Sequence, residues 1–262
     1  MQSTDLDKIL DDAFSEISDS RQSYEPAIQF REMGVVKNIS AGIATVTGLS
    51  GTGFEELLEF PNNLYGMAFN LEEEEIGVVL LGRSDHLQAG DTVLRTHRVA
   101  DIPVGEELIG RVVDPLGNPM DDKGPIAFTE RYPIERPAPP IMSREAVNEP
   151  LQTGIKVVDA IIPIGRGQRE LILGDRQTGK TAIAIDTILN QYDKDVLCIY
   201  CAIGQRTAAV AKVISDLTKR GAMEYTIVVV SEGNNSPGLQ YLPPYAATSI
   251  AEYFMEQGRD VL

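Results

Sequence analysis

The sequence predicts a multidomain chain that has an N-terminal helix, a small antiparallel β-barrel and an incomplete α/β domain with a phosphate-binding loop. Three observations carry this prediction. Apolar residues form a helical stripe over 4–18, short β-rich runs separated by turn residues fill 27–95, and strand and helix patterns alternate after residue 150. The expected domains are therefore 1–26 (helix and linker), 27–95 (barrel) and 96–262 (partial α/β domain).

Composition narrows the class of protein. The chain has 262 residues, of which 43% are apolar and 24% charged, and its formal net charge is −16. So acidic a chain argues against general nucleic-acid binding, which needs a locally positive surface. No apolar run approaches the ~18 residues that span a bilayer, and the N-terminus lacks a basic region followed by an apolar one. We therefore expect a cell-interior location.

The cysteines and histidines carry no predicted site. Cys198 and Cys201 form C-x-x-C, a spacing used in redox and zinc sites, but they lie in the apolar run "DVLCIYCAIG". That run predicts a buried strand, on which positions i and i+3 point to opposite faces. Two core cysteines are therefore expected. His86 and His97 have no neighbours that resemble a triad or a metal set.

The N-terminal helix is expected to be amphipathic. Its first turn carries a weak capping box, Thr4 and Asp7, and its opposite face is acidic. An isolated helix of this length is marginal in water, so its apolar stripe needs a partner, either its own domain or another subunit. The stripe consists of Leu6, Ile9, Leu10, Ala13, Phe14 and Ile17.

The barrel and its connection follow from turn and proline spacing. Gly, Asn and Asp turns recur every eight to twelve residues between the runs "GVVKNI", "GIATVTGL", "ELLEF", "EIGVVLL" and "DTVLRT". Glu72–Glu75 is expected to be a solvated loop. Residues 114–150 are rich in proline, which predicts an extended connection between modules.

A phosphate loop is expected at 174–181, "GDRQTGKT", between the predicted strand "ELILG" and a helix that starts at Lys180. Strands are then expected at "DVLCIYCAIG" and "YTIVVVS", and helices at 206–219 and 244–257. This alternation predicts a parallel sheet.

The chemistry of the loop predicts binding of a nucleotide with Mg²⁺. Its glycines allow close backbone approach, and the backbone N–H groups and the helix N-terminus face the phosphates. Lys180 is expected to reach the terminal phosphates and the Thr181 hydroxyl to coordinate Mg²⁺. Arg176 and Gln177 could hydrogen-bond either the nucleotide or a neighbouring chain. The expected binding residues are Gly174, Asp175, Arg176, Gln177, Thr178, Gly179, Lys180 and Thr181.

Hydrolysis needs more than a loop. An aspartate at the end of a second apolar strand must hold the Mg²⁺ shell, and a further group must orient water. The run "TIVVV" ends in Ser231 and Glu232, a poor match, and the sequence stops as another strand begins, so we expect a fragment. Gln205 stands where a water-orienting group would be. Glutamine can hold water but cannot accept its proton, although GTPases also position water with a glutamine.

These residues resemble the alpha-subunit family of the rotary F-type ATP synthases. The resemblance covers essentially the whole chain and is close to residue for residue over 152–191. It continues in "GIATVTGL", "VGEELIGRVVDPLGNPMDDKGPI", "AIGQR", "YTIVVV" and "LQYLPPYAA", and the polar loop "GDRQTGKT" separates alpha from catalytic beta subunits. The stretch "VSEGNNSPG" (230–238) and the acidic first helix depart from the usual pattern.

The resemblance implies a RecA-like P-loop domain that binds ATP or ADP with Mg²⁺ at a non-catalytic site. Where beta subunits have a catalytic glutamate in "GER", this chain has Gly204, Gln205 and Arg206. Implied partners are the alternating beta subunits of a hexameric ring, the central shaft subunit and a stator subunit at the N-terminal helix. The complex would lie on the cytoplasmic side of a membrane and contact the membrane only through its other subunits. The coupling ion, proton or sodium, stays open.

Two alternatives remain at this point. One is an autonomous hexameric ATPase, such as a helicase or a secretion ATPase, which a glutamate at 205 and a glycine-rich loop would have favoured. The other is an interaction module with a vestigial loop, which measured Mg-ATP binding would exclude.

Overall fold

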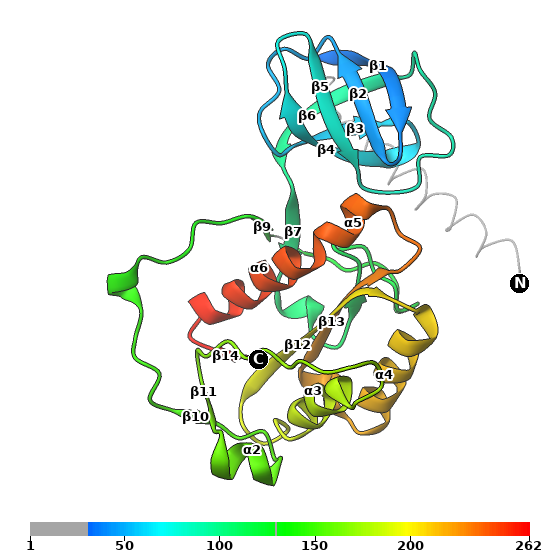
Figure 1. Cartoon of the computed structure of the whole chain (residues 1–262). Coiled ribbons are helices and arrows are strands. Elements are labelled where there is room, and N and C mark those ends of the chain that lie inside the picture. Colours follow the sequence, from blue (N-terminus) through cyan, green and yellow to red (C-terminus); the bar gives the residue numbers. More distant parts are fainter. Residues whose placement is uncertain (1–30, 129) are drawn as a thin grey trace, which may run out of the picture. The chain divides into compact units, whose positions relative to one another are not determined.

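The computed structural model describes residues 31–128 and 130–262 (Figure 1). Met33–Leu262 form one compact unit that contains a closed antiparallel barrel and an α/β domain, as the sequence predicts. The expected helix at 4–18 lies outside the described residues. Over the part that the structure describes, no helix combines the length and the apolar character that a membrane crossing needs.

Six strands close the barrel, and every neighbouring pair is antiparallel. Alternate residues point inward, and Val36, Val46 and Val78 are almost completely buried in its interior. The sequence did not predict β4, because Gly66 and Asn70 weaken its strand pattern. In spatial order the strands are β1 (Met33–Ser40), β2 (Ile43–Thr47), β5 (Glu75–Leu80), β4 (Leu64–Leu71), β3 (Glu56–Phe60) and β6 (Thr92–Val99).

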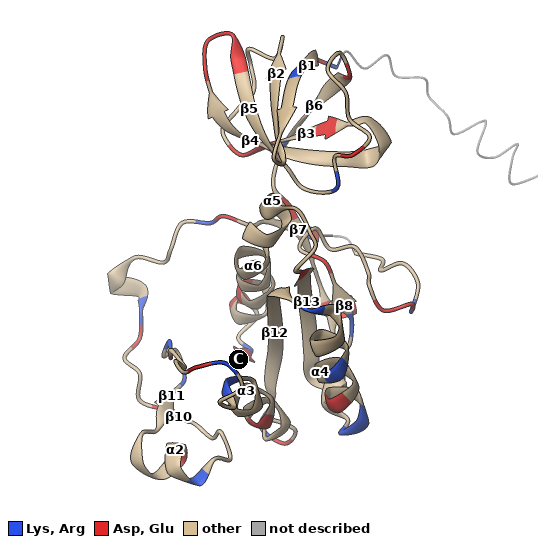
Figure 2. Cartoon of the chain, turned by 45° about the vertical axis from the view of Figure 1, so that its right-hand side comes forward, with Lys and Arg blue, Asp and Glu red and all other residues tan. Residues whose placement is uncertain are grey.

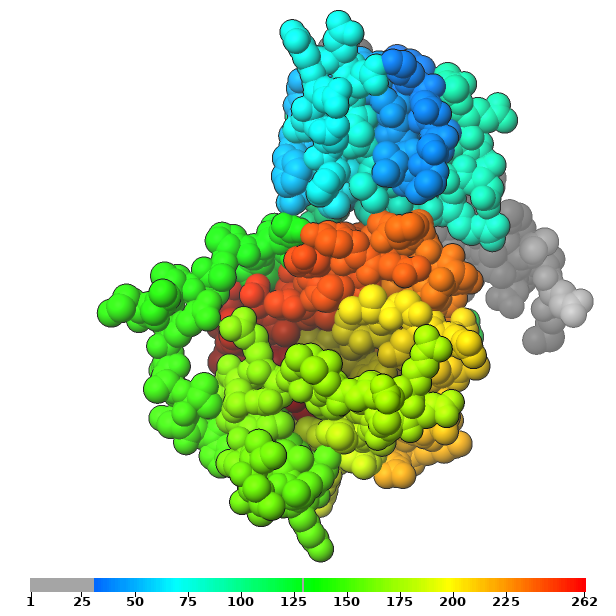
Figure 3. Space-filling view, in the orientation of Figure 1, coloured from blue at the N-terminus to red at the C-terminus, as the bar shows by residue number. Residues whose placement is uncertain are grey.

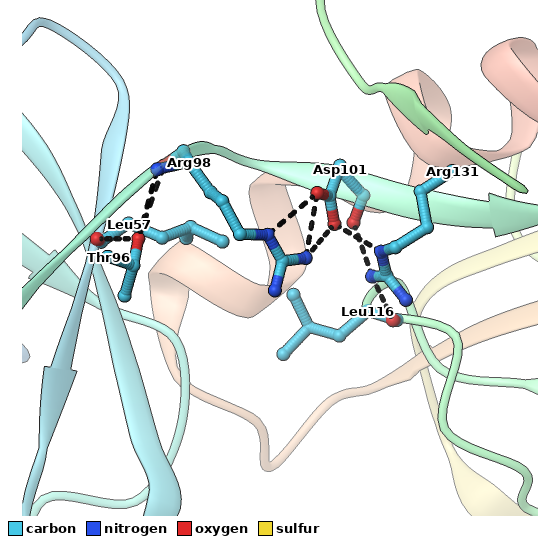
Figure 4. A network of polar contacts seen from close by, with 6 residues as sticks. All are labelled: Leu57, Thr96, Arg98, Asp101, Leu116 and Arg131. Atoms are coloured by element: carbon cyan, nitrogen blue, oxygen red, sulfur yellow. Dashed lines mark hydrogen bonds and ion pairs between the residues drawn. The ribbon is translucent and has the colours of Figure 1, made fainter. Parts of the chain in front are cut away.

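A polar network marks the connection that leaves the barrel (Figure 4). The Asp101 carboxylate accepts hydrogen bonds from Arg98, at 2.7 and 2.8 Å from its Nη2, and from Arg131 Nε at 2.6 Å. Arg131 Nη2 also donates to the carbonyl oxygens of Asp101 and Leu116. The network therefore joins the end of β6 to the two-stranded sheet formed by β7 (Asp101–Val104) and β9 (Glu130–Pro133).

The α/β domain is built on a parallel sheet in the order β14 (Asp260–Val261), β12 (Val196–Gln205), β13 (Thr226–Glu232) and β8 (Val112–Val113). The helix α4 (Thr207–Lys219) packs on one face and α6 (Pro243–Glu256) on the other. Apolar side chains of β12 and β13 alternate between these two layers. The predicted strands and helices that follow the loop are confirmed.

One prediction is wrong. Residues 170–174, expected as the strand "ELILG", form no strand, and the Leu171 and Leu173 side chains are 76% and 81% exposed. A β-strand is held by hydrogen bonds to a neighbouring strand. Among the described residues no strand pairs with this segment, and the edge strand β14 pairs only with β12.

The remaining elements are short. The proline-rich residues 114–150 are mostly irregular apart from β9, η3 (Ile141–Ser143) and Pro150. The prediction that they connect two modules is also wrong, because β8 before them and β12 after them belong to one sheet. The antiparallel pair β10 (Pro150–Leu151) and β11 (Ile164–Gly165) flanks α2 (Lys156–Ile161). The other helices are η1 (Pro61–Asn63), η2 (Glu106–Leu108), α3 (Lys180–Leu189), η4 (Ala222–Tyr225) and α5 (Pro237–Tyr241).

Candidate nucleotide-binding site

The loop 174–179 turns sharply into α3. Gln177 and Gly179 both have left-handed backbone conformations, with φ of 63° and 95°. Gly179 is the N-cap of α3, and a Cβ at Gly174 would lie 2.7 Å from Thr178 Oγ1. The two glycines of the motif are therefore needed for a conformation and for a close approach that other residues would resist.

Lys180 folds back over the loop. Its Nζ donates hydrogen bonds to the carbonyl oxygens of Gly174 and Asp175, both at 2.5 Å. The Thr178 hydroxyl also donates to the Asp175 carbonyl, at 2.9 Å. The ammonium group is thus already held at the loop, and a phosphate there can replace these neutral carbonyl contacts with charge-assisted ones.

The N-terminus of α3 adds a second source of positive potential. Lys180 and Thr181 are its first two residues, so their backbone N–H groups have no partner within the helix. Residues 171–179 and Thr181 are exposed, and Figure 3 shows this yellow-green part of the chain on the visible surface. An anion can therefore reach the loop directly from solvent.

The donor set fits a magnesium ion that is held mainly by phosphate oxygens. Mg²⁺ keeps several waters and takes one or two protein oxygens in phosphate sites, and the exposed Thr181 hydroxyl supplies one. Within 31–128 and 130–262, no group of three or more His, Cys, Asp or Glu side chains could hold a metal ion.

Gln205 lies at the carboxyl end of β12, half-buried. Because α3 leads from the loop to the start of β12, its N-terminus faces the same sheet edge as Gln205, the edge where α/β domains bind ligands. The described residues show no hydrogen bond from the Gln205 side chain to the loop. Glu232, at the end of β13, is the acidic residue beside it in register.

A hydrogen-bonded clasp fastens the other end of α3, and the sequence did not predict it. Asp159 accepts from Thr153 N (2.9 Å), Thr153 Oγ1 (2.7 Å) and Gly154 N (2.9 Å), and these bonds lower the pKa of its carboxyl. Directly after α3, the side chains of Asn190 and Gln191 donate to the Thr153 and Gln152 carbonyls. The only sequence signal was "TG" followed by an aspartate five residues later.

The two cysteines lie on opposite faces of β12, as predicted. Cys198 packs in the α4 layer and Cys201 against the α6 layer. Burial raises the pKa of Cys198 to about 12 and that of Cys201 to about 11. Both are therefore neutral core thiols near pH 7.

The fold and the loop together define a nucleotide-binding protein of the P-loop class with an N-terminal barrel. A family model described as "ATP synthase alpha/beta family, nucleotide-binding domain" matches residues 154–262. A second, "ATP synthase alpha/beta family, beta-barrel domain", matches residues 30–97. The chain belongs to the ATP synthase alpha/beta family.

The curated relatives that the chain matches support the same family. The chain is 64% identical to "ATP synthase subunit alpha 1" of Marinomonas sp. (strain MWYL1) over 254 residues, which is 97% of this chain and 50% of the relative. It is 63% identical to "ATP synthase subunit alpha 2" of Albidiferax ferrireducens, over 98% of this chain and 48% of the relative. The chain thus spans about half the length of these relatives.

Proposed function

We propose that the chain serves as the barrel and nucleotide-binding region of an alpha subunit in an ion-translocating F-type ATP synthase, where it binds ATP or ADP with Mg²⁺ without hydrolysing it. The observation that carries this proposal is the position of Lys180. The residue is the first of α3, and its bonds to the carbonyls of Gly174 and Asp175 hold the ammonium group at the loop, where a phosphate-binding lysine is needed.

The loop residues Gly174–Thr181 surround the phosphates in this proposal. Backbone N–H groups and the α3 dipole attract the phosphate oxygens, and Lys180 neutralises the terminal charge. The Thr181 hydroxyl and the phosphates hold Mg²⁺, which supplies charge neutralisation. Arg176 and Gln177 are exposed in the middle of the loop and are available to a nucleotide or a neighbouring subunit.

Gln205 makes the site non-catalytic. Its amide can orient a water molecule at the carboxyl end of β12 but cannot take the proton of that water at neutral pH. Hydrolysis by the complex would then occur on other subunits, and this chain would support it structurally.

The partners follow from the family and are proposals for the whole protein. We infer alternation with catalytic beta subunits in a hexameric ring around a central shaft subunit, and contact of the N-terminal segment with a stator subunit. The relatives are about twice as long as this chain, and a region like their remaining half would supply the Mg²⁺-shell aspartate. The complex would lie on the cytoplasmic side of a membrane.

The surface charge agrees with a protein that does not bind nucleic acid. Acidic and basic residues are interspersed over the ribbon in Figure 2, and Glu72, Glu73 and Glu74 make the loop between β4 and β5 strongly acidic, while Glu75 begins β5. A phosphate backbone would meet net repulsion from a chain of charge −16.

Titration of the chain with Mg-ATP tests the proposal. Lys180→Ala should weaken binding about tenfold or more, because a charge-assisted contact to phosphate is lost. Lys156→Ala is the matched control, since Lys156 is the exposed first residue of α2 and should leave affinity unchanged. Equal affinity of wild type and Lys180→Ala would contradict the assigned site. Sustained ATP turnover by the chain would instead favour an autonomous ATPase.

A further inference from the structure

The turn after β13, residues 233–236, contacts both Gln205 and the barrel. It belongs to "VSEGNNSPG", one of the two stretches expected from the sequence to depart from the usual family pattern. No role in phosphate binding explains these residues.

At one end the turn holds the backbone of Gln205. Gly233 N donates to the Gln205 carbonyl at 3.1 Å. The Gln240 amide donates to the Asn235 carbonyl at 2.9 Å and to the Gly233 carbonyl at 3.4 Å, which closes the turn. The β12–β13 register skips Gly204, so Gln205 follows a bulge, a feature that re-aims side chains next to functional sites.

At the other end the turn is fixed to barrel strand β5. The Ser236 hydroxyl donates to the Leu80 carbonyl at 3.0 Å and accepts from Leu239 N at 3.3 Å. Ser236 therefore caps α5 and bonds to the barrel with the same oxygen. A Cβ at Gly238 would lie 2.6 Å from Val79 Cγ1, so only glycine lets α5 approach β5 this closely.

We propose that Ser236 is a positioning residue that links Gln205 to the barrel, so that nucleotide binding beside Gln205 changes how firmly α5 is held on β5. The inference rests on the proposed nucleotide site. The turn 233–236 is bonded to Gln205 at one end and to Leu80 at the other, which gives a continuous path. Any coupling between the two ends must act equally in both directions.

Three variants of Ser236 separate capping from the barrel contact. Ser236→Thr keeps a hydroxyl that can donate to Leu80 and accept from Leu239. Ser236→Asp keeps the acceptor that caps α5 but has no proton to donate to Leu80. Ser143→Asp is the control for added charge, because the Ser143 hydroxyl also donates to a carbonyl, that of Pro140, on the exposed connection.

The measurement is hydrogen–deuterium exchange of peptides covering 76–82 and 236–242 in the full chain, with and without saturating Mg-ADP. In wild type, Ser236→Thr and Ser143→Asp, Mg-ADP should slow exchange in 76–82 by about fivefold or more, the lower end of ordinary coupling. In Ser236→Asp the nucleotide should still bind and slow exchange in 236–242 but leave 76–82 unchanged.

Each other result has one meaning. Binding of Mg-ADP to wild type with no change in 76–82 overturns the link and leaves the proposed function intact. A full response of 76–82 in Ser236→Asp also overturns it. If wild type does not bind Mg-ADP in a direct titration, both the proposed function and the link are refuted.

Discussion

The guanidinium of Arg111 holds the carboxylate of Asp121 through two parallel hydrogen bonds, Nε to Oδ2 at 2.7 Å and Nη2 to Oδ1 at 2.8 Å. Val112 N donates to the same carboxylate at 3.1 Å. Because Val112 begins β8, this pair fixes the strand that extends the nucleotide-domain sheet beyond β13.

Acid should weaken this pair. The bonds from Arg111 lower the pKa of Asp121 to about 2, against an ordinary value near 3.8. A lowered folded-state pKa stabilises the fold above the unfolded value, and this stabilisation is lost as pH falls through about 2. Asp121→Asn should therefore lower the free energy of unfolding by roughly 2 kcal/mol at pH 7, and by progressively less below pH 4.

Urea unfolding between pH 2 and pH 7 measures this effect. Asp85→Asn is the matched control, because the Arg83 and Asp85 side chains of its ion pair are 87% and 75% exposed and should contribute little. A pH-independent difference in stability between Asp121→Asn and wild type would mean that Arg111 does not lower the pKa of Asp121.

Gly179 allows a second test, of the loop conformation. Alanine at φ 95° costs about 1–2 kcal/mol in backbone strain, and a Cβ there meets no other atom within 4 Å. Gly90→Ala is an equivalent change, at φ 98° with the same open surroundings, but in the barrel domain. Both variants should lose similar stability in thermal unfolding, whereas only Gly179→Ala should lose affinity for Mg-ATP. Equal affinity in the two variants would mean that the left-handed residue is not part of the binding loop.

The exposed segment before the loop should tolerate replacement of an apolar residue by a polar one. Leu173→Ser should change the free energy of unfolding of this chain by less than about 0.5 kcal/mol, because the side chain is 81% exposed. Leu197→Ala, at a side chain 1% exposed on β12, should cost about 2–5 kcal/mol. Urea denaturation compares them, and a large loss in Leu173→Ser would show that the segment is buried after all.

The cysteines predict slow thiol chemistry. Burial raises the pKa of both thiols, so little thiolate is present at pH 8, and alkylation by iodoacetamide should be much slower in the folded chain than in guanidinium. Mild oxidation should form no Cys198–Cys201 disulfide, because the side chains point to opposite faces of β12. Mass spectrometry of the folded protein reads both results, and rapid disulfide formation without unfolding would refute the arrangement.

Sequence patterns were informative where an element is defined by its own residues. The apolar run of β12 and the start of α3 at Lys180 could be predicted because periodicity and the glycine motif are local. The segment 170–174 has an equally clear strand pattern but no paired neighbour among the described residues, so periodicity alone gave the wrong state.

Long-range contacts left little trace in the sequence. Asp159 and Asn190 are both bonded to the turn at 153–154, and no sequence pattern predicts this. Ser236 bonds to Leu80, which lies 156 residues earlier in the chain. Side-chain to backbone bonds of this kind depend on how separate elements pack. Local sequence patterns therefore predicted the start of α3 but neither contact.

The closed barrel can fold before the parallel sheet while the chain is being synthesised. All six of its strands lie between Met33 and Val99, so every one of its strand pairs can form once that segment has left the ribosome. The parallel sheet, by contrast, contains both β8, near residue 112, and β14, near residue 260, so it cannot be complete before residue 260 has been made. The N-terminal domain can thus fold first and present Leu80 as a finished surface on which Ser236 later docks.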